Sequence, residues 1–283
     1  MLVFLSGILL HRSIGKAWPE YIFGKISGIA WPYFFWSIIF LTVQMMTFPG
    51  PSKVVTGIAL HSSTYLWFLH FLFIYYIIAL VANKLNFNPW LLVALGVLVS
   101  FGPEAYRISR FGYLMAFFFL GNIVAARRFD FELFRTSQNG RIILGFSVTF
   151  FVISSALSVS GISLRYRPAG YWASISGIIL WISIFVWLPQ GNLSRVLAWI
   201  GKSSLVFYVS HMVAMTVVSR ASAAYLGLEF QDIYLLNIVS AGILGTVLIK
   251  ASDRSSIIKS MFSLTPLRRR STWLMARFIK RTG

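Results

Sequence analysis

The sequence predicts an all-α fold, a polytopic bundle of about nine transmembrane helices. Of the 283 residues, 58% are hydrophobic and only 11% are charged, whereas soluble proteins contain about 25% charged residues. The hydrophobic residues gather in long runs, many close to the ~20 residues that a helix needs to cross ~30 Å of hydrocarbon. Runs such as 142–153 and 175–188 are apolar on nearly every face, unlike the alternating segments of a membrane β-barrel. These observations exclude a water-soluble domain.

Short stretches rich in turn residues divide the predicted spans. Pro, Gly, Asn and Ser interrupt the apolar runs at 48–51, 86–89, 102–104, 137–140, 167–170 and 190–192. In order along the chain, we expect spans at 2–10, 28–48, 64–82, 90–102, 111–126, 141–162, 171–189, 204–220 and 233–250. No internal repeat divides them further.

Lys and Arg residues predict which side of the membrane each loop faces, because basic loops are retained on the cytoplasmic side. Most of the 25 basic residues fall on the same side as the C-terminus, so we expect a cytoplasmic tail. We divide the chain into a membrane domain, residues 1–252, and a basic tail, residues 253–283. The tail combines arginines at 268–270 with Trp273 and Phe278, a pattern typical of segments that lie on anionic lipids. A disordered tail is the alternative.

The beginning of the chain carries a separate expectation. An odd number of spans with a cytoplasmic tail places Met1 outside, and the run at 2–10 would cover only ~14 Å as a helix. No basic region precedes this run and no small-residue cleavage site follows it, so it does not resemble a signal peptide. We therefore expect that at least one upstream helix is missing from this chain. An interfacial or re-entrant segment of a naturally short protein is the alternative.

His211 is the first candidate catalytic residue. It lies ~12 Å into its predicted span, where an ionisable group costs ~2.5–3.5 kcal/mol and is therefore a functional candidate. Tyr208 precedes it by three positions, so the phenol and the imidazole share a helix face and could form a hydrogen-bonded pair. An imidazole can act as a general base toward a hydroxyl. A structural histidine bonded to a neighbouring helix is the alternative.

The remaining polar residues exclude several chemistries. His70 lies near the outer edge of its predicted span, and His11 and His61 lie in or near loops. The chain has no cysteine and no cluster of His and carboxylates within the spans, so we expect no metal site. A nucleophile-elbow serine and a phosphate-cradling glycine loop are also missing. Because the topology explains the net charge of +18, we expect no nucleic-acid partner.

Basic residues of two predicted cytoplasmic loops are candidates for anion binding. Arg12, Lys16 and Lys25 fall in one loop, and Arg195 and Lys202 fall in another. Converging cations could hold the phosphates of an acyl-CoA, because charge-assisted hydrogen bonds to phosphate are strong. For each residue alone, a role in topology only is the alternative.

Five short motifs occur in order along the chain. They are Phe-Leu-Ser-Gly-Ile-Leu-Leu at 4–10, Lys25 followed by Pro-Tyr-Phe-Phe-Trp at 32–36, Leu-Trp-Phe-Leu at 66–69 followed by Leu-Phe at 72–73, Phe-Phe-Phe-Leu-Gly at 117–121, and Gly-Lys-Ser-Ser-Leu at 201–205 leading to Tyr208 and His211. Together they resemble acyltransferase family 3, the membrane O-acyltransferases of sugars and polysaccharides. Each motif alone is weak, but the ordered set is specific.

The resemblance implies a bundle of about ten helices that takes an acyl group, acetyl or succinyl, from cytoplasmic acyl-CoA. The implied acceptor is a hydroxyl of an exported or envelope glycan, such as an exopolysaccharide, or of a lipid-linked oligosaccharide. The resemblance also implies a bacterial inner membrane, membrane lipids as partners, and acyl-CoA as a substrate, with no bound cofactor. The family's catalytic histidine lies on its first span, which we expect upstream of Met1, so inactivity of this chain is one expected outcome.

Two other functions remain open from the sequence. A transporter or export component for a lipid-linked glycan would need a polar path through several spans, whereas polar residues such as Gln44 and Asn122 are sparse. A non-catalytic remnant is the third possibility. Failure of the chain to accumulate in membranes would favour it.

Overall fold

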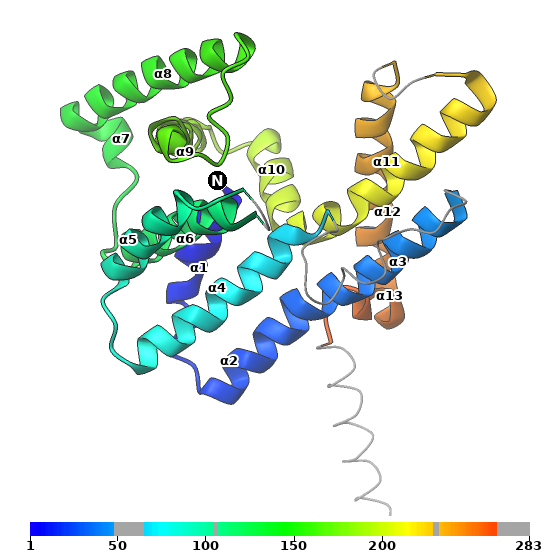
Figure 1. Cartoon of the computed structure of the whole chain (residues 1–283), viewed down its shortest axis with the longest axis horizontal. Helices are drawn as coiled ribbons and strands as arrows, with labels where there is room; N and C mark the ends of the chain where they lie inside the picture. Colours follow the sequence, from blue (N-terminus) through cyan, green and yellow to red (C-terminus); the bar gives the residue numbers. More distant parts are fainter. Residues whose placement is uncertain (48–64, 105–106, 229–231, 265–283) are drawn as a thin grey trace, which may run out of the picture. The chain divides into compact units, whose positions relative to one another are not determined.

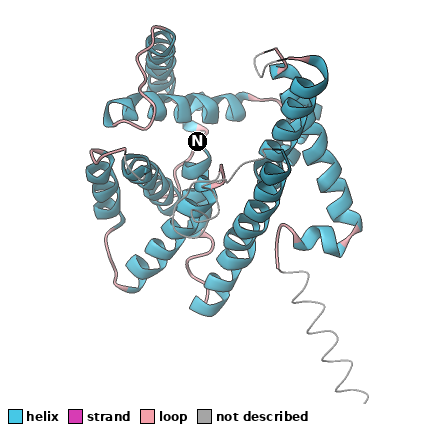
Figure 2. Cartoon of the chain, turned by 45° about the vertical axis from the view of Figure 1, so that its right-hand side comes forward, coloured by secondary structure: helices cyan, strands magenta, loops and turns pink. Residues whose placement is uncertain are grey.

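The computed structural model describes residues 1–47, 65–104, 107–228 and 232–264. These residues form helices joined by loops, and no strand occurs among them (Figure 2). The predicted all-α class is therefore confirmed. A helix satisfies its backbone hydrogen bonds internally, so its apolar side chains can face lipid.

Seven helices in the described part of the chain are long and apolar enough to cross a membrane, not the nine that we expected. They are α2 to α3 as one continuous helix (Trp18–Met46), α4 (Trp67–Lys84), α6 (Ile108–Ala126), α8 (Gln138–Val159), α9 with its preceding turn (Pro168–Trp187), α11 (Ser204–Leu226) and α12 (Tyr234–Arg254). The expected spans at 2–10 and 90–102 are helical, as α1 (Leu2–His11) and α5 (Pro89–Ser100). Helices of 10 and 12 residues reach only ~15 and ~18 Å. By helix length the count of nine is wrong, because these two apolar runs are shorter than a full span.

Shorter elements complete the described chain. The first long helix consists of α2 (Trp18–Lys25), a π-helical turn η1 (Ile26–Ala30) and α3 (Trp31–Thr47). The others are α7 (Leu133–Thr136), η4 (Pro168–Gly170) leading into α9 (Tyr171–Trp187), α10 (Asn192–Lys202) and α13 (Ser256–Ser260). Local signals set helix ends: the Asn88 side chain accepts a hydrogen bond from the Trp90 N–H at the start of α5, and Gly227 ends α11 at φ 65°.

The chain divides into two compact units. The first contains residues 1–21 and 75–195, and the second contains residues 22–74 and 196–283. In the first unit α1 and α5 pack on α6, while α7, α8 and α9 pack on one another (Figure 1). In the second unit α3 and α12 pack on α11, and α13 packs on α12.

Glycines allow α1 and α6 to approach very closely. A Cβ added at Gly7 would lie 1.9 Å from the Phe118 carbonyl oxygen, and one added at Gly121 would lie 2.1 Å from the Phe4 carbonyl oxygen. Small residues at helix crossings are typical of membrane proteins, because van der Waals packing there replaces the hydrophobic effect. Two of the motifs, at 4–10 and 117–121, therefore meet at one crossing.

The core of the second unit joins residues from both ends of the chain. Its buried members are Tyr33, Trp36, Leu66, Leu69, Val209 and Phe262. The Phe262 ring stacks on Trp36 with centroids 5.5 Å apart, and Trp31 Nε1 donates to the Ser260 carbonyl oxygen at 2.7 Å. The first residues of the predicted tail therefore pack on α3. The arginines at 268–270 lie outside the described residues.

Candidate active site

His211 has one ring nitrogen held by its own helix. It lies ~10 Å along α11 at helical rise and is half-buried in the second unit. Its Nδ1 is 2.6 Å from the Tyr208 carbonyl oxygen. A carbonyl oxygen can only accept, so Nδ1 carries the proton in this contact, and Nε2 of the neutral ring holds the lone pair. This is the tautomer that a general base acting through Nε2 requires.

The predicted hydrogen bond between the Tyr208 phenol and the His211 imidazole is not formed. The Tyr208 hydroxyl donates instead to the Tyr65 carbonyl oxygen at 3.0 Å, while the Tyr65 hydroxyl donates back to the Val209 carbonyl oxygen. These two bonds fix α11 to the residue just before the Leu-Trp-Phe-Leu motif. Tyr208 therefore orients His211 through its main chain, and its phenol positions the helix.

Aromatic rings surround this group. Tyr65 meets the His211 ring edge-on with centroids 5.6 Å apart, and Phe40 lies 4.5 Å from the Tyr65 ring. Phe68 lies 5.5 Å from the Tyr208 ring. Apolar surroundings lower the local dielectric constant, so hydrogen bonds and charges at His211 interact more strongly than in water.

His70 borders a separate cavity in the second unit. The cavity has a volume of about 270 Å³, and its lining residues are Ala30, Tyr33, Phe34, Leu69, His70, Phe73 and Ile74. The Tyr33 ring lies edge-on to His70 with centroids 5.6 Å apart. The buried Nδ1 of His70 has no hydrogen-bond partner among the described residues. An imidazole in this position can contact a polar group that enters an otherwise largely apolar cavity.

A third polar site lies in the first unit, at the end of α1. A cavity of about 250 Å³ is lined by His11, Asn83 and Asn122 together with apolar residues such as Phe87 and Leu92. Two basic residues, Arg12 and Lys84, directly follow lining residues along the chain. Amide and imidazole groups beside exposed cations suit an anionic ligand.

The five candidate cations are distributed over both units. Lys16 pairs with Glu20 at 2.7 Å on the surface, and the Arg195 guanidinium donates to Asn192 Oδ1. These residues and the exposed Arg12 belong to the first unit, whereas Lys25 and Lys202 belong to the second. Convergence of all five on one acyl-CoA therefore stays a prediction.

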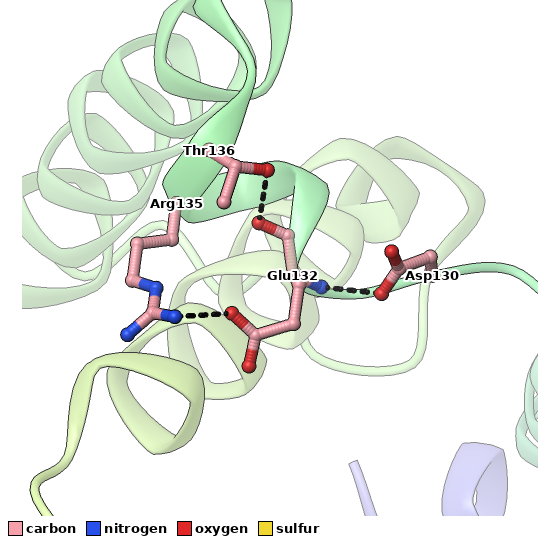
Figure 3. Close-up of polar contacts among 4 residues, drawn as sticks. All are labelled: Asp130, Glu132, Arg135 and Thr136. Carbon is pink, nitrogen blue, oxygen red and sulfur yellow. Dashed lines mark hydrogen bonds and ion pairs between the residues drawn. The ribbon is translucent and has the colours of Figure 1, made fainter.

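The acidic residues before α7 are used in local contacts. Figure 3 shows the Glu132 N–H donating to Asp130 Oδ1 at 2.9 Å, the Thr136 hydroxyl donating to the Glu132 carbonyl oxygen at 3.0 Å, and Arg135 pairing with Glu132 at 3.0 Å. These contacts are local to α7 and the residues just before it, so these carboxylates have neighbouring partners within the same segment. Within the described residues, no group of three or more His, Asp or Glu side chains could hold a metal ion.

Comparison with known proteins decides the family. A family model described as an acyltransferase domain, Acyl_transf_3, matches residues 1–251. The chain belongs to acyltransferase family 3. The resemblance of the five motifs is thus confirmed, and the seven apolar helices make the protein an integral membrane acyltransferase. Neither the curated proteins nor the solved structures gave a match.

The acyltransferase match covers all three sites. His211, His70 and the His11 cavity lie within residues 1–251, whereas α13 and Phe262 lie beyond them. The stacking of Phe262 on Trp36 therefore joins a residue beyond the match to a residue within it.

Two residues of this family 3 protein are not identified by sequence reasoning. Tyr65 bonds to a residue 144 positions away, and no local pattern indicates such a contact. His11 resembles an ordinary loop residue in the sequence, although the neighbouring Arg12 is a candidate for anion binding. The position of His11 next to that candidate cation is the signal that could draw attention to it, because His11 lines the polar cavity.

Proposed function

We propose that this protein is an O-acyltransferase that moves an acetyl or succinyl group from acyl-CoA to a hydroxyl of an exported or envelope glycan. The observation that carries the proposal is the acyltransferase match over residues 1–251. His211 supports it, because its Nδ1 is engaged by the Tyr208 carbonyl oxygen and its Nε2 is left as the proton acceptor. A lipid-linked oligosaccharide would present the same hydroxyl chemistry.

In the proposed reaction, the acyl group passes directly from CoA to the acceptor hydroxyl. Nε2 of His211 takes the proton of the acceptor hydroxyl as the hydroxyl oxygen attacks the thioester carbonyl carbon. The carbon–sulfur bond breaks, CoA leaves as a thiolate, and the imidazolium returns the proton to sulfur. Tyr208 holds Nδ1 of the ring throughout, and the bonds between Tyr208 and Tyr65 keep α11 in place.

We assign the donor's phosphates to the basic side of the protein. Arg12 beside the His11 cavity is the leading candidate in this proposal, and the other candidates are Lys16, Lys25, Arg195 and Lys202. This side would face the cytoplasm of a bacterial inner membrane, where basic loops are retained and acyl-CoA is available. The C-terminal tail would lie on the same side, against membrane lipids.

Acyl transfer from labelled donors tests the proposal. The 283-residue chain is reconstituted in proteoliposomes and given radiolabelled acetyl-CoA or succinyl-CoA, with an envelope glycan fraction as the acceptor. We expect alkali-labile label in the glycan, because an ester is cleaved by alkali. No transfer from either donor, by protein that is folded and inserted, would contradict the proposal.

A further inference from the structure

The helix α10 (Asn192–Lys202) has a strongly two-sided sequence. Leu193, Val196, Leu197 and Ile200 recur at the spacing that places them on one face of a helix. Arg195 and Lys202, seven positions apart, lie on the opposite face. The helix contains no acidic residue. Such a distribution of side chains is typical of a helix at a boundary between water and hydrocarbon.

No residue of α10 is buried in the protein. Leu193 is 60% exposed, Val196 is 51% exposed and Ile200 is 40% exposed. The helix has 11 residues and would reach only ~16 Å, so it cannot cross the membrane and hide these side chains in that way. The apolar face needs another surface to cover it.

The connections of α10 keep both of its ends close to spanning helices. α9 ends at Trp187, so four residues link it to α10, and Ser203 alone separates α10 from α11. Four linking residues extend at most ~18 Å, so both ends of α10 stay near the ends of spanning helices. Its apolar face is therefore always within reach of the lipid boundary.

The basic residues of α10 favour an anionic lipid surface. With the apolar face turned into the boundary, Arg195 and Lys202 point to the level of the lipid phosphates. We propose that α10 is an in-plane helix that docks on the anionic leaflet of the membrane. The docked helix is coupled to α11, because the Trp199 ring meets Phe207 edge-on with centroids 5.8 Å apart. Tyr208 and His211 follow within the next turn of α11.

The absence of cysteine from the sequence permits a direct test. The variant Val196→Cys carries a single thiol on the apolar face, and Ala198→Cys carries one on the opposite, exposed face. Each thiol is labelled with an environment-sensitive fluorophore, and the full chain is reconstituted in vesicles of phosphatidylcholine with phosphatidylglycerol. We expect brominated lipids to quench the label of Val196→Cys several-fold more than that of Ala198→Cys, and aqueous iodide to show the reverse order.

A second site and a charge variant complete the test. Leu193→Cys repeats the measurement on the apolar face, and helical circular dichroism with a monodisperse elution profile confirms folding. Omitting phosphatidylglycerol should reduce the contrast between the two faces, and Arg195→Gln with Lys202→Gln should remove that lipid dependence. Equal iodide quenching on both faces would overturn the in-plane helix. If the difference in quenching between the two faces does not depend on phosphatidylglycerol, or appears only when CoA is added, docking on anionic lipid would be overturned.

Discussion

At His211, two amide substitutions separate the roles of the two ring nitrogens. Asn places an amide N–H near the position of Nδ1, so His211→Asn can still donate to the Tyr208 carbonyl oxygen but carries no basic nitrogen. We expect its thermal unfolding temperature to match that of the wild type. Acyl transfer should fall by ~10²–10⁴-fold, the contribution typical of a general base.

His211→Gln serves as the matched control for this residue. Its amide reaches the position of Nε2 instead, so the bond to Tyr208 is lost along with the base. We expect it to be as inactive as His211→Asn and less stable by ~0.5–1.5 kcal/mol. Full activity of either variant would show that His211 is structural.

The two tyrosine bonds predict coupled losses of stability. Tyr65→Phe removes the donor to Val209, and Tyr208→Phe removes the donor to Tyr65. Each should lower the free energy of unfolding by ~0.5–1.5 kcal/mol. Because each bond holds the groups of the other in place, the double variant should lose less than the sum of the two. Strict additivity, measured by unfolding in detergent, would contradict the reciprocal arrangement.

At this scale the sequence identifies the polar residues but not their partners. The spacing of Tyr208 and His211 places both on one helix face, and the structure agrees, with ring centroids 5.8 Å apart. The phenol nevertheless bonds across to Tyr65, because a carbonyl oxygen just before α4 lies within its reach. Helical periodicity describes one helix at a time and gives no information on such contacts between helices.

Among the elements, the close crossing of α1 and α6 should make the unfolding free energy strongly sensitive to one added methyl group. Gly7→Ala would force a Cβ to within 1.9 Å of the Phe118 carbonyl oxygen, so the helices must separate. We expect a loss of more than ~1 kcal/mol in unfolding free energy, measured by unfolding in detergent.

Gly145→Ala is the matched control for this crossing. Gly145 also lies inside a helix, α8, but nothing lies within 4 Å of its added Cβ. Alanine favours the helix by up to ~1 kcal/mol relative to glycine, so this variant should be at least as stable as the wild type. Equal destabilisation at Gly7 and Gly145 would argue against a close crossing.

The π-helical turn η1 contacts the residues that follow α13 and should hold this segment in place. Ser27 Oγ, in this turn, lies 3.0 Å from Ser263 Oγ and accepts from the Leu264 N–H at 2.9 Å. Ser27→Ala should release this segment and cost ~1 kcal/mol. The measurement is the rate of limited proteolysis after residue 254, with Ser6→Ala, whose hydroxyl bonds within its own helix, as the control. Unchanged cleavage would show that the stacking of Phe262 on Trp36 suffices.

Long apolar runs locate six of the seven spanning helices to within several residues, but the first begins at Trp18, ten residues before the predicted span at 28–48. The helices α10 and α13 are not predicted. α10 falls in a predicted loop, because its apolar run at 196–200 has only five residues and is far too short for a predicted span. α13 falls in the predicted tail, because it has only five residues and depends on contacts with α3 and α12. Both helices require tertiary or membrane contacts that composition does not reveal.

In the molecule as a whole, the short helix α5 connects one group of loops of the first unit with another. Trp90 at its start lies 5.5 Å from the Arg127 guanidinium, and Glu104 after its end pairs with Arg167 at 3.8 Å. The chain therefore passes along α5 from one group of loops to another, although the helix is too short to count as a span by length.

This arrangement predicts opposite labelling of two exposed positions. In right-side-out vesicles, the thiol of Leu85→Cys, before α5, should react with an impermeant maleimide only after permeabilisation. The thiol of Ile162→Cys, after α8, should react directly. Both positions are exposed. Labelling of both from the same side would show that α5 does not carry the chain across.

The family membership and the all-α class can be predicted from the sequence, because hydrophobic runs and ordered motifs can be recognised without knowing any tertiary contact. The composition of the two units is not accessible. Nothing in residues 22–74 indicates that their partners lie after residue 196, since the contacts join aromatic residues such as Trp36 and Phe262 at the two ends of the chain.

That division of the chain also bears on the order of biosynthesis. Residues 22–74 emerge from the ribosome early, yet the residues that complete their unit emerge last. At ~5–20 residues per second, synthesis of the intervening segment takes on the order of ten seconds. During this interval Tyr33, Trp36 and Leu66 lack the α11 surface that buries them in the finished protein. These side chains therefore stay without their final packing partners until α11 has been synthesised.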